Sequence, residues 1–229
     1  MTEPRNLRPG ARRHAGRLPR RGRAALALGL LLASAAATAV AAGNAVTSEK
    51  LTAWNAAANL CPAPQTLTAS ASRDSYVDQG SPTSNFGASS DLFVQSKSGP
   101  QNRRTLVQFT LPGAPAGCSL AVATLRLNNT AGAAGRTIDV YRAAASWTET
   151  GVTWNNQPAA TGTAVGAASS SSTGWRTWDV LAHVQAMYSG ANNGFVLRDR
   201  TEDAAASPEQ KYQSREGSPN DPELVLTFQ

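Results

Sequence analysis

The sequence predicts an antiparallel all-β domain, a sandwich or a barrel, with one short helix. Three observations support this prediction. Apolar and polar residues alternate in short runs from Leu67 onward, turn residues such as Gly, Pro, Asn and Ser separate these runs, and no long helical pattern lies between them. The chain has 229 residues, of which 41% are hydrophobic, so it is long enough for a single well-formed core.

The first 42 residues are predicted to be a secretory signal peptide. Residues 1–23 hold eight arginines and one acid, the run 24–40 is apolar, and Ala39-Val40-Ala41 fits a signal-peptidase site. An uncleaved membrane anchor is the alternative, because the apolar run is nearly long enough to span a bilayer. The leader carries a charge of +7 and the rest of the chain −1, so the formal charge of +6 does not indicate a nucleic-acid partner.

Residues 43–66 lack sustained periodicity and are predicted to be a linker to the domain at 67–229. Trp54, in this linker, is expected to pack loosely on the domain. Cys61 and Cys118 are the only two cysteines of the chain. Export to an oxidising compartment favours a disulfide between them, with two free thiols as the alternative. The mature protein is therefore expected to be extracellular or on the cell surface, with no membrane contact after cleavage.

Eight runs are predicted to be strands. Alternation is clearest where Ala123, Leu125 and Leu127 share one face and polar residues the other. The stretch 161–174, rich in Ala, Ser and Thr, is predicted to be a flexible or edge connection. The eight runs are Leu67–Ser72, Asp91–Ser96, Thr105–Leu111, Val122–Asn128, Thr137–Tyr141, Trp175–Val180, Phe195–Arg198 and Leu224–Phe228.

One segment has helical spacing, with apolar residues at Val180, Val184 and Met187 or Tyr188. Asp179 is placed to cap its start and Gly190 to end it. His183 lies on this helix and is the only histidine after the leader, and we expect it to have a structural role.

Several motifs occur in a characteristic order along residues 66–229. They include Asp74-Ser75-Tyr76-Val77-Asp78, Arg103–Phe109, Ser146-Trp147-Thr148-Glu149, Val152–Pro158 and Ser214-Arg215-Glu216. In these motifs the sequence resembles the DNRLRE domain family, secreted modules related to disaggregatase-type proteins and to alginate-binding carbohydrate-binding modules. The resemblance implies a jelly-roll-like antiparallel β-sandwich, found on the cell surface or attached to secreted enzymes.

The function favoured by these observations is non-catalytic binding of a carbohydrate or cell-envelope polymer, with an acidic polysaccharide as one candidate ligand. Planar guanidinium groups bind carboxylates with two parallel hydrogen bonds, and aromatic rings pack against sugars. Arg126, Arg198 and Arg215, together with Tyr141, are expected to point outward from strands and to form a shallow binding face. A solvated face with ordinary surface arginines is the alternative, and it would fit a structural or adhesive surface protein.

Catalysis has weak support in the sequence, because a single histidine after the leader and no Gly-x-Ser-x-Gly turn leave little basis for a serine triad. Counting alone leaves a carboxylate pair or a lyase open. No cofactor is expected, and a structural calcium ion on Asp74, Asp78 and Asn85 stays open. Carboxylate candidates are Glu149, Asp179, Glu202, Asp203 and Glu216, lyase candidates are Tyr141, Arg126 and Lys211, and Trp147, Trp154, Trp175 and Trp178 are expected to be core.

Overall fold

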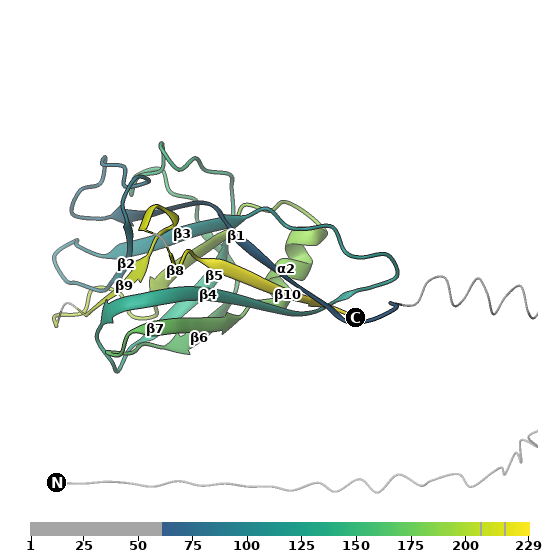
Figure 1. The fold of residues 1–229 in the computed structure, drawn as a ribbon. Coiled ribbons are helices and arrows are strands. Elements are labelled where there is room, and N and C mark those ends of the chain that lie inside the picture. Colours follow the sequence, from purple (N-terminus) through teal and green to yellow (C-terminus); the bar gives the residue numbers. More distant parts are fainter. Residues whose placement is uncertain (1–60, 207, 218) are drawn as a thin grey trace, which may run out of the picture. The chain divides into compact units, whose positions relative to one another are not determined.

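The computed structural model describes residues 61–206, 208–217 and 219–229 (Figure 1). The predicted signal peptide, its cleavage site and Trp54 lie outside the described residues, so these predictions stay untested. The elements in chain order are β1 (Gln65–Asp78), β2 (Asp91–Gln95), β3 (Arg103–Phe109), β4 (Leu120–Gly132), β5 (Thr137–Ala143), β6 (Ala160–Ala168), β7 (Gly174–Asp179), α2 (Leu181–Tyr188), β8 (Phe195–Asp199), β9 (Glu209–Gln213), the short 3-10 helix η1 (Arg215–Gly217) and β10 (Glu223–Phe228). Among the described residues, no helix is long and apolar enough to cross a membrane.

All strand pairs are antiparallel, which confirms the predicted all-β class. The hydrogen-bonded order is β1-β10-β4-β9-β2-β3-β8-β5-β6, and β7 adds to β4. Strand β1 pairs along Gln65–Ser70 with β10 and along Ala71–Asp78 with β3, with a register shift at Ala71/Arg73. Because β1 serves both neighbours, β1, β10, β4, β9, β2 and β3 close into a ring. The sheet thus has a barrel-like closure.

Two apolar clusters use the two faces of this sheet. The main core is formed by strands of the ring together with β5, β7, β8 and α2, and it includes Leu125, Leu197, Leu224 and Phe228, all fully buried. The second cluster lies on the other face of β1, β3, β8 and β5, beneath the segment 144–159. Its members are Val77, Leu106, Ala143, Trp147, Val152 and Val196. The segment 144–159 is therefore packed onto the sheet, and it brings its side chains to the outer face of β3 and β8.

Helix α2 confirms the predicted helical segment. Val184 and Met187 face the core. The N-cap is Val180, one residue after the expected Asp179, and it makes no side-chain capping hydrogen bond; Oδ1 of Asp179 still accepts a hydrogen bond from the Leu181 amide at 3.1 Å. The helix ends at Tyr188, two residues before Gly190.

Two strands were not predicted. The stretch 161–174 contains the edge strand β6, which pairs with β5 alone and consists mostly of small residues that give no clear alternation. Strand β9 has the sequence Glu-Gln-Lys-Tyr-Gln, in which a buried glutamine, Gln210, takes an inward position and donates to the Ala133 carbonyl. An inward glutamine hides the apolar and polar alternation by which strands are recognised.

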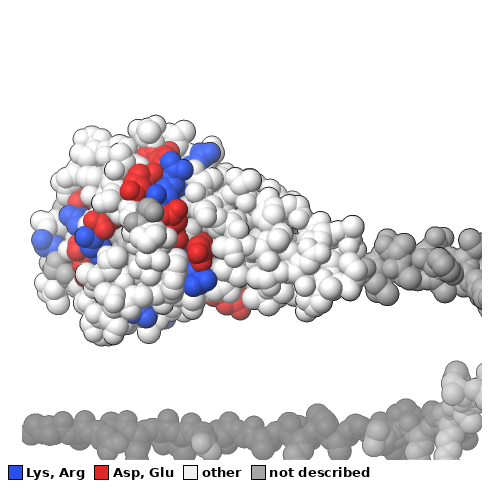
Figure 2. Space-filling model, in the orientation of Figure 1, with Lys and Arg blue, Asp and Glu red and all other residues white. Residues whose placement is uncertain are grey.

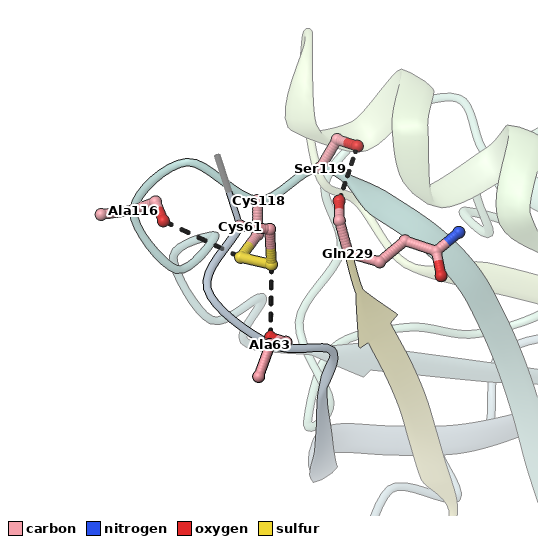
Figure 3. The surroundings of a disulfide bond; sticks show 6 residues. All are labelled: Cys61, Ala63, Ala116, Cys118, Ser119 and Gln229. Carbon is pink, nitrogen blue, oxygen red and sulfur yellow. Dashed lines mark hydrogen bonds between the residues drawn. A yellow bond between two sulfur atoms is a disulfide. The ribbon is translucent and has the colours of Figure 1, made fainter. Parts of the chain in front are cut away.

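The predicted disulfide between Cys61 and Cys118 is formed, with the two Cα atoms 4.4 Å apart (Figure 3). It ties the segment before β1 to the turn before β4. The neighbouring Ser119 exchanges two backbone hydrogen bonds with Gln229, both at 2.9 Å, so the entry to β1, the start of β4 and the C-terminus meet at one end of the domain.

Candidate functional site

Two of the predicted binding residues, Tyr141 and Arg198, come together on neighbouring strands. Strands β5 and β8 pair in the register Asp139↔Arg198 and Tyr141↔Val196, which puts Tyr141 and Arg198 on one face of the sheet. The Arg198 guanidinium lies 4.8 Å from the centre of the Tyr141 ring, and Nη2 donates to the tyrosine hydroxyl at 3.3 Å. Arg198 forms no ion pair within the described residues, and its Nε has no hydrogen-bond partner.

A second cation and aromatic ring lie next to this pair. The register of β3 with β8 pairs Leu106 with Val196, so Arg104 and Arg198 share the outer face of adjacent strands. The Arg104 guanidinium lies 4.6 Å from the Trp154 ring centre, and it binds Glu202 through two hydrogen bonds of 2.7 Å. We call Arg104, Tyr141, Trp154 and Arg198 the arginine–aromatic surface.

The charges of the arginine–aromatic surface are unequally compensated. Glu202 neutralises Arg104 by a two-point ion pair, whereas Arg198 contacts the hydroxyl group of Tyr141. The hydrogen bond to Tyr141 raises the pKa of Arg198, and Glu202 and Asp139 act in the same direction, so the guanidinium is fully charged. The surface thus offers one cation without a bound carboxylate, beside two aromatic rings.

Arg126 lies on the outer face of β4, as predicted, but in another part of the sheet. Strand β4 borders β7, β9 and β10, whereas β8 borders β3 and β5. The Arg126 guanidinium pairs with Glu223 at 3.0 Å and lies 4.4 Å from the Trp175 ring centre. It is a separate cation and aromatic pair.

Arg215 does not lie on a strand, so the expectation that it points outward from one is wrong. It begins η1, because the chain turns sharply after β9, and it ion-pairs with Glu149 at 3.0 Å and with Glu216 at 2.8 Å. Its Nη1 also donates to the Ser72 carbonyl at 3.0 Å. The guanidinium links β1, η1 and the segment 144–159, and most of its donors already have partners.

Arg215 is part of an acidic cluster of Asp74, Glu149 and Glu216, whose nearest oxygens lie within 4.8 Å of one another. Asp74 is 1% exposed, and its Oδ1 has no hydrogen-bond partner. Burial raises the pKa of Asp74 to about 7; the Arg215 backbone amide opposes this change, and the charges of Glu216 and Glu149 add to it. Asp74 thus holds a proton near neutral pH.

A shared proton fits this cluster better than a metal ion does. Glu149 accepts from the Asp74 amide at 2.9 Å, Glu216 accepts from the Ser214 hydroxyl at 2.6 Å, and Arg215 lies against both carboxylates. A cation would have to displace these donors. A proton on Oδ1 of Asp74 would instead donate to Glu216 and satisfy the one oxygen that lacks a partner.

The predicted calcium ligands are not brought together as a set. Asp78 accepts from Arg103 Nε and from the Gly80 amide, both at 2.8 Å. The amide nitrogen of Asn85 donates to the Glu149 and Val152 carbonyls, both at 2.7 Å. The two side chains therefore hold the surrounding turns in place.

The charged residues considered for catalysis are dispersed. Only Glu149 and Glu216 approach each other, and Arg215 binds both. Asp179 accepts from the Leu181 amide at the start of α2, Glu202 binds Arg104 and Asp203 accepts from the Asn102 amide group. The lyase candidates Tyr141, Arg126 and Lys211 lie on three different strands, and Lys211 pairs with Asp91 at 2.8 Å.

The four tryptophans divide into two groups. Trp147 and Trp178 are buried, as expected for core residues, and each indole N–H donates to a backbone carbonyl. Trp154 and Trp175 are only half-buried, and each lies against an arginine. Trp154 packs at the edge of the second apolar cluster, whereas Trp175 belongs to neither cluster, so the prediction of a core position is wrong for Trp175. Sequence alternation could have suggested Trp175, which shares a face of β7 with the exposed Thr177.

Acidic and basic side chains are interleaved on the face drawn in Figure 2. They gather at the end of the domain far from the C-terminus, and the part nearer the C-terminus is largely uncharged. The charge pattern of this face is thus mixed rather than uniformly basic.

The arginine–aromatic surface thus combines a cation without an ion pair, which can bind a carboxylate, with aromatic rings, which can pack against apolar groups. The model of carbohydrate-binding module family 96 matches residues 65–228, which is more than half of the chain. The chain belongs to carbohydrate-binding module family 96. Carbohydrate binding is therefore the function class of this family 96 module. A search of curated proteins finds no match.

Proposed function

We propose that the domain is a secreted, non-catalytic module that binds an acidic polysaccharide through the arginine–aromatic surface. The observation that carries the proposal is Arg198, a charged guanidinium that is held by Tyr141 and lacks a carboxylate partner among the described residues. Its free donors suit a carboxylate of a uronic acid residue. The Trp154 ring, 4.6 Å from the Arg104 guanidinium, is only half-buried, and its exposed part can contact a sugar ring.

Secretion is supported by the arginine-rich flank, the apolar run and the small residues of the first 42 positions, and by a disulfide that suits an oxidising compartment. The finer relationship to DNRLRE and disaggregatase-type proteins, and the jelly-roll topology that it implies, belong to this proposal as well. They rest on the order of the motifs between residues 66 and 229.

The non-catalytic assignment is supported by the partners of the charged residues. Glu202, Asp179 and Asp203 hold other groups in place, and Arg215 binds both Glu149 and Glu216. A carboxylate pair that hydrolyses glycosides needs one free acid and one free base or nucleophile across an open gap. Incubation with polyuronates tests this assignment, because release of unsaturated sugar ends would identify a lyase and contradict it.

Binding to polygalacturonate and to dextran, an uncharged polymer, tests the function by isothermal titration. We expect saturable binding to polygalacturonate only. Replacing Arg198 with Gln should weaken it at least tenfold, because a charge-assisted two-point contact contributes about 1.5–3 kcal/mol. Lys97→Gln is the matched control, because it removes the same charge from a loop residue outside the surface, and it should leave affinity unchanged.

The same titration, repeated with further variants, tests where on the domain the polysaccharide binds. If Arg126→Gln weakens binding and Arg198→Gln does not, the ligand binds at the Arg126 and Trp175 pair. If Lys97→Gln and Arg198→Gln weaken binding equally, attraction is non-specific and the proposed surface is wrong. A chain that binds none of a panel of acidic and neutral polysaccharides would instead be a structural or adhesive protein.

A further inference from the structure

A pocket of about 490 Å³ lies between strands β5 and β6 and helix α2. Its lining residues are Arg142, Gly162, Thr163, Val165, Ala182 and His183. It is separate from the arginine–aromatic surface. Arg142 pairs with Phe195 of the main core, whereas its neighbour Tyr141 pairs with Val196 on the other face of the sheet. Volumes of this size are typical of sites for small ligands.

Arg142 is the unusual residue of this pocket. Every other arginine in the described part of the chain has an ion pair, a hydrogen bond or an aromatic ring as a partner, and Arg142 has none of these. Its Nε is shielded from solvent and has no acceptor. The two terminal nitrogens are not shielded in this way, and the guanidinium lines the pocket without a neutralising carboxylate, so the pocket favours an anion that accepts from them.

His183 supplies the second polar group. It is 4% exposed, and its Nε2 is buried without a hydrogen-bond partner. Burial lowers the pKa of His183 and the charge of Arg142 adds to this, although the backbone carbonyls of Val140 and Thr163 oppose it. The ring is therefore neutral at pH 7. His183 therefore adds a neutral imidazole, and not a second cation, to the wall of the pocket.

Gly162 keeps the space between these two groups open. Its φ is +86°, and a Cβ there would lie 3.1 Å from His183 Cε1 and 3.5 Å from Arg142 Nε. A side chain at this position would stand between the guanidinium and the imidazole. Val165 and Ala182 complete the wall with apolar groups, which suit the C–H face of a sugar.

We infer that this pocket binds one sugar acid residue, with its carboxylate on the Arg142 guanidinium and its ring against the imidazole of His183. The inference rests on the proposed function for its class of ligand, a uronic acid, but on none of the residues of the arginine–aromatic surface. A pocket admits a single residue, either a free sugar acid or the end of a chain, whereas the open surface contacts the polymer along its length.

The test follows the imidazole of His183 by NMR during titration of the full chain with glucuronate. Glucose, with a similar ring and hydroxyls but no charge, and inorganic phosphate, an anion without a sugar, are the comparison ligands. The chain has two histidines, His14 and His183, so the signals are readily assigned. We expect a saturable shift of the His183 signals with glucuronate, and none with glucose or phosphate at equal concentration.

Variants connect the shift to the pocket. Arg142→Gln should weaken glucuronate binding at least tenfold. Arg176→Gln is the matched control, because Arg176 also has an Nε without a partner but lies on β7, and it should leave the affinity unchanged. Melting temperatures establish that both variants fold. If Arg142→Gln does not fold, contacts between the sugar protons and the His183 ring in the unmodified chain still decide the question.

The outcomes separate this inference from the proposed function. If the His183 signals do not shift at tens of millimolar glucuronate, the proposed sugar acid site in the pocket is wrong. Polygalacturonate binding that depends on Arg198 would be unaffected by that result. A phosphate response equal to that of glucuronate overturns the sugar acid assignment. A His183 shift in a chain that does not bind polygalacturonate overturns the proposed surface alone. A glucuronate dimer that competes as well as the monomer identifies a chain end, and one that does not identifies the free sugar acid.

Discussion

Replacing Asp74 with Asn should stabilise the domain at pH 8 and have little effect at pH 4. Asp74 is buried, and its pKa is raised from 3.8 to about 7. Asn has the shape of the protonated carboxyl group: its oxygen can accept from the Arg215 amide, now 2.9 Å from Oδ2, and its NH₂ can donate to Glu216. The variant therefore imitates the neutral form at every pH.

The magnitude follows from linkage between protonation and folding. Because the pKa of Asp74 is higher in the folded than in the unfolded chain, ionisation of this carboxyl group at high pH destabilises the folded chain. The unfavourable contribution is absent below about pH 4, grows as the pH rises, and is complete above about pH 7. A shift of about three pKa units corresponds to about 4 kcal/mol. The unfolding free energy of D74N, relative to the parent chain, should rise by that order between pH 4 and pH 8.

Urea unfolding followed by tryptophan fluorescence measures this difference at several pH values. Asp78→Asn is the control. Because the Asp78 carboxylate accepts from Arg103 and from the Gly80 amide, this substitution should make the domain less stable at pH 8. If D74N is less stable than the parent chain at pH 8, the ionised carboxylate is favourable and the shared-proton argument is refuted. A calcium-dependent rise of the melting temperature in the parent, absent in D74N, would identify a cation instead.

Three further results are expected. Replacing Cys61 and Cys118 together with Ser should lower the unfolding free energy by about 4 kcal/mol in urea titrations, because the bridge closes a loop with a sequence separation of 57, and an unchanged midpoint would contradict this. Gly87→Ala should cost about 1–3 kcal/mol in the same assay, since its Cβ would overlap the Glu149 carbonyl oxygen, whereas Gly113→Ala, with open space around it, should cost less than 1 kcal/mol. Affinity for polygalacturonate should fall as ionic strength rises from about 0.01 to about 1 M, over which the Debye length shrinks from about 30 to about 3 Å, and salt-independent binding would exclude a role for charge.

The strands that could be predicted are those in which buried apolar residues alternate with exposed polar ones. In β4, Leu125 and Leu127 face the core with polar neighbours between them, and Leu224 and Leu226 do the same in β10. Strand β9 was missed because its inward Gln210 is satisfied by hydrogen bonds rather than by apolar contact. Such a partner is visible only once the chain is folded.

The candidate site shows the same limit. Alternation placed Tyr141 and Arg198 on outer faces, but their contact depends on the register between β5 and β8, two strands more than fifty residues apart in sequence. Arg215 looked equally available in the sequence. Its ion pairs with Glu149 and Glu216 depend on a turn and a loop whose paths no periodicity encodes.

The meeting of the domain's two ends has a mechanical consequence. Gln65 and Phe228 form the outermost pair between strands β1 and β10. Opposite forces on the start of β1 and the end of β10 would therefore separate the two strands one residue pair at a time. The bridge from Cys61 to Cys118 precedes this first pair. Tension that enters before Cys61 crosses a covalent link to the start of β4 and reaches Gln229 through the Ser119 hydrogen bonds, without loading the ladder. Reduction would redirect the same tension into β1, whose loss would open the ring of strands.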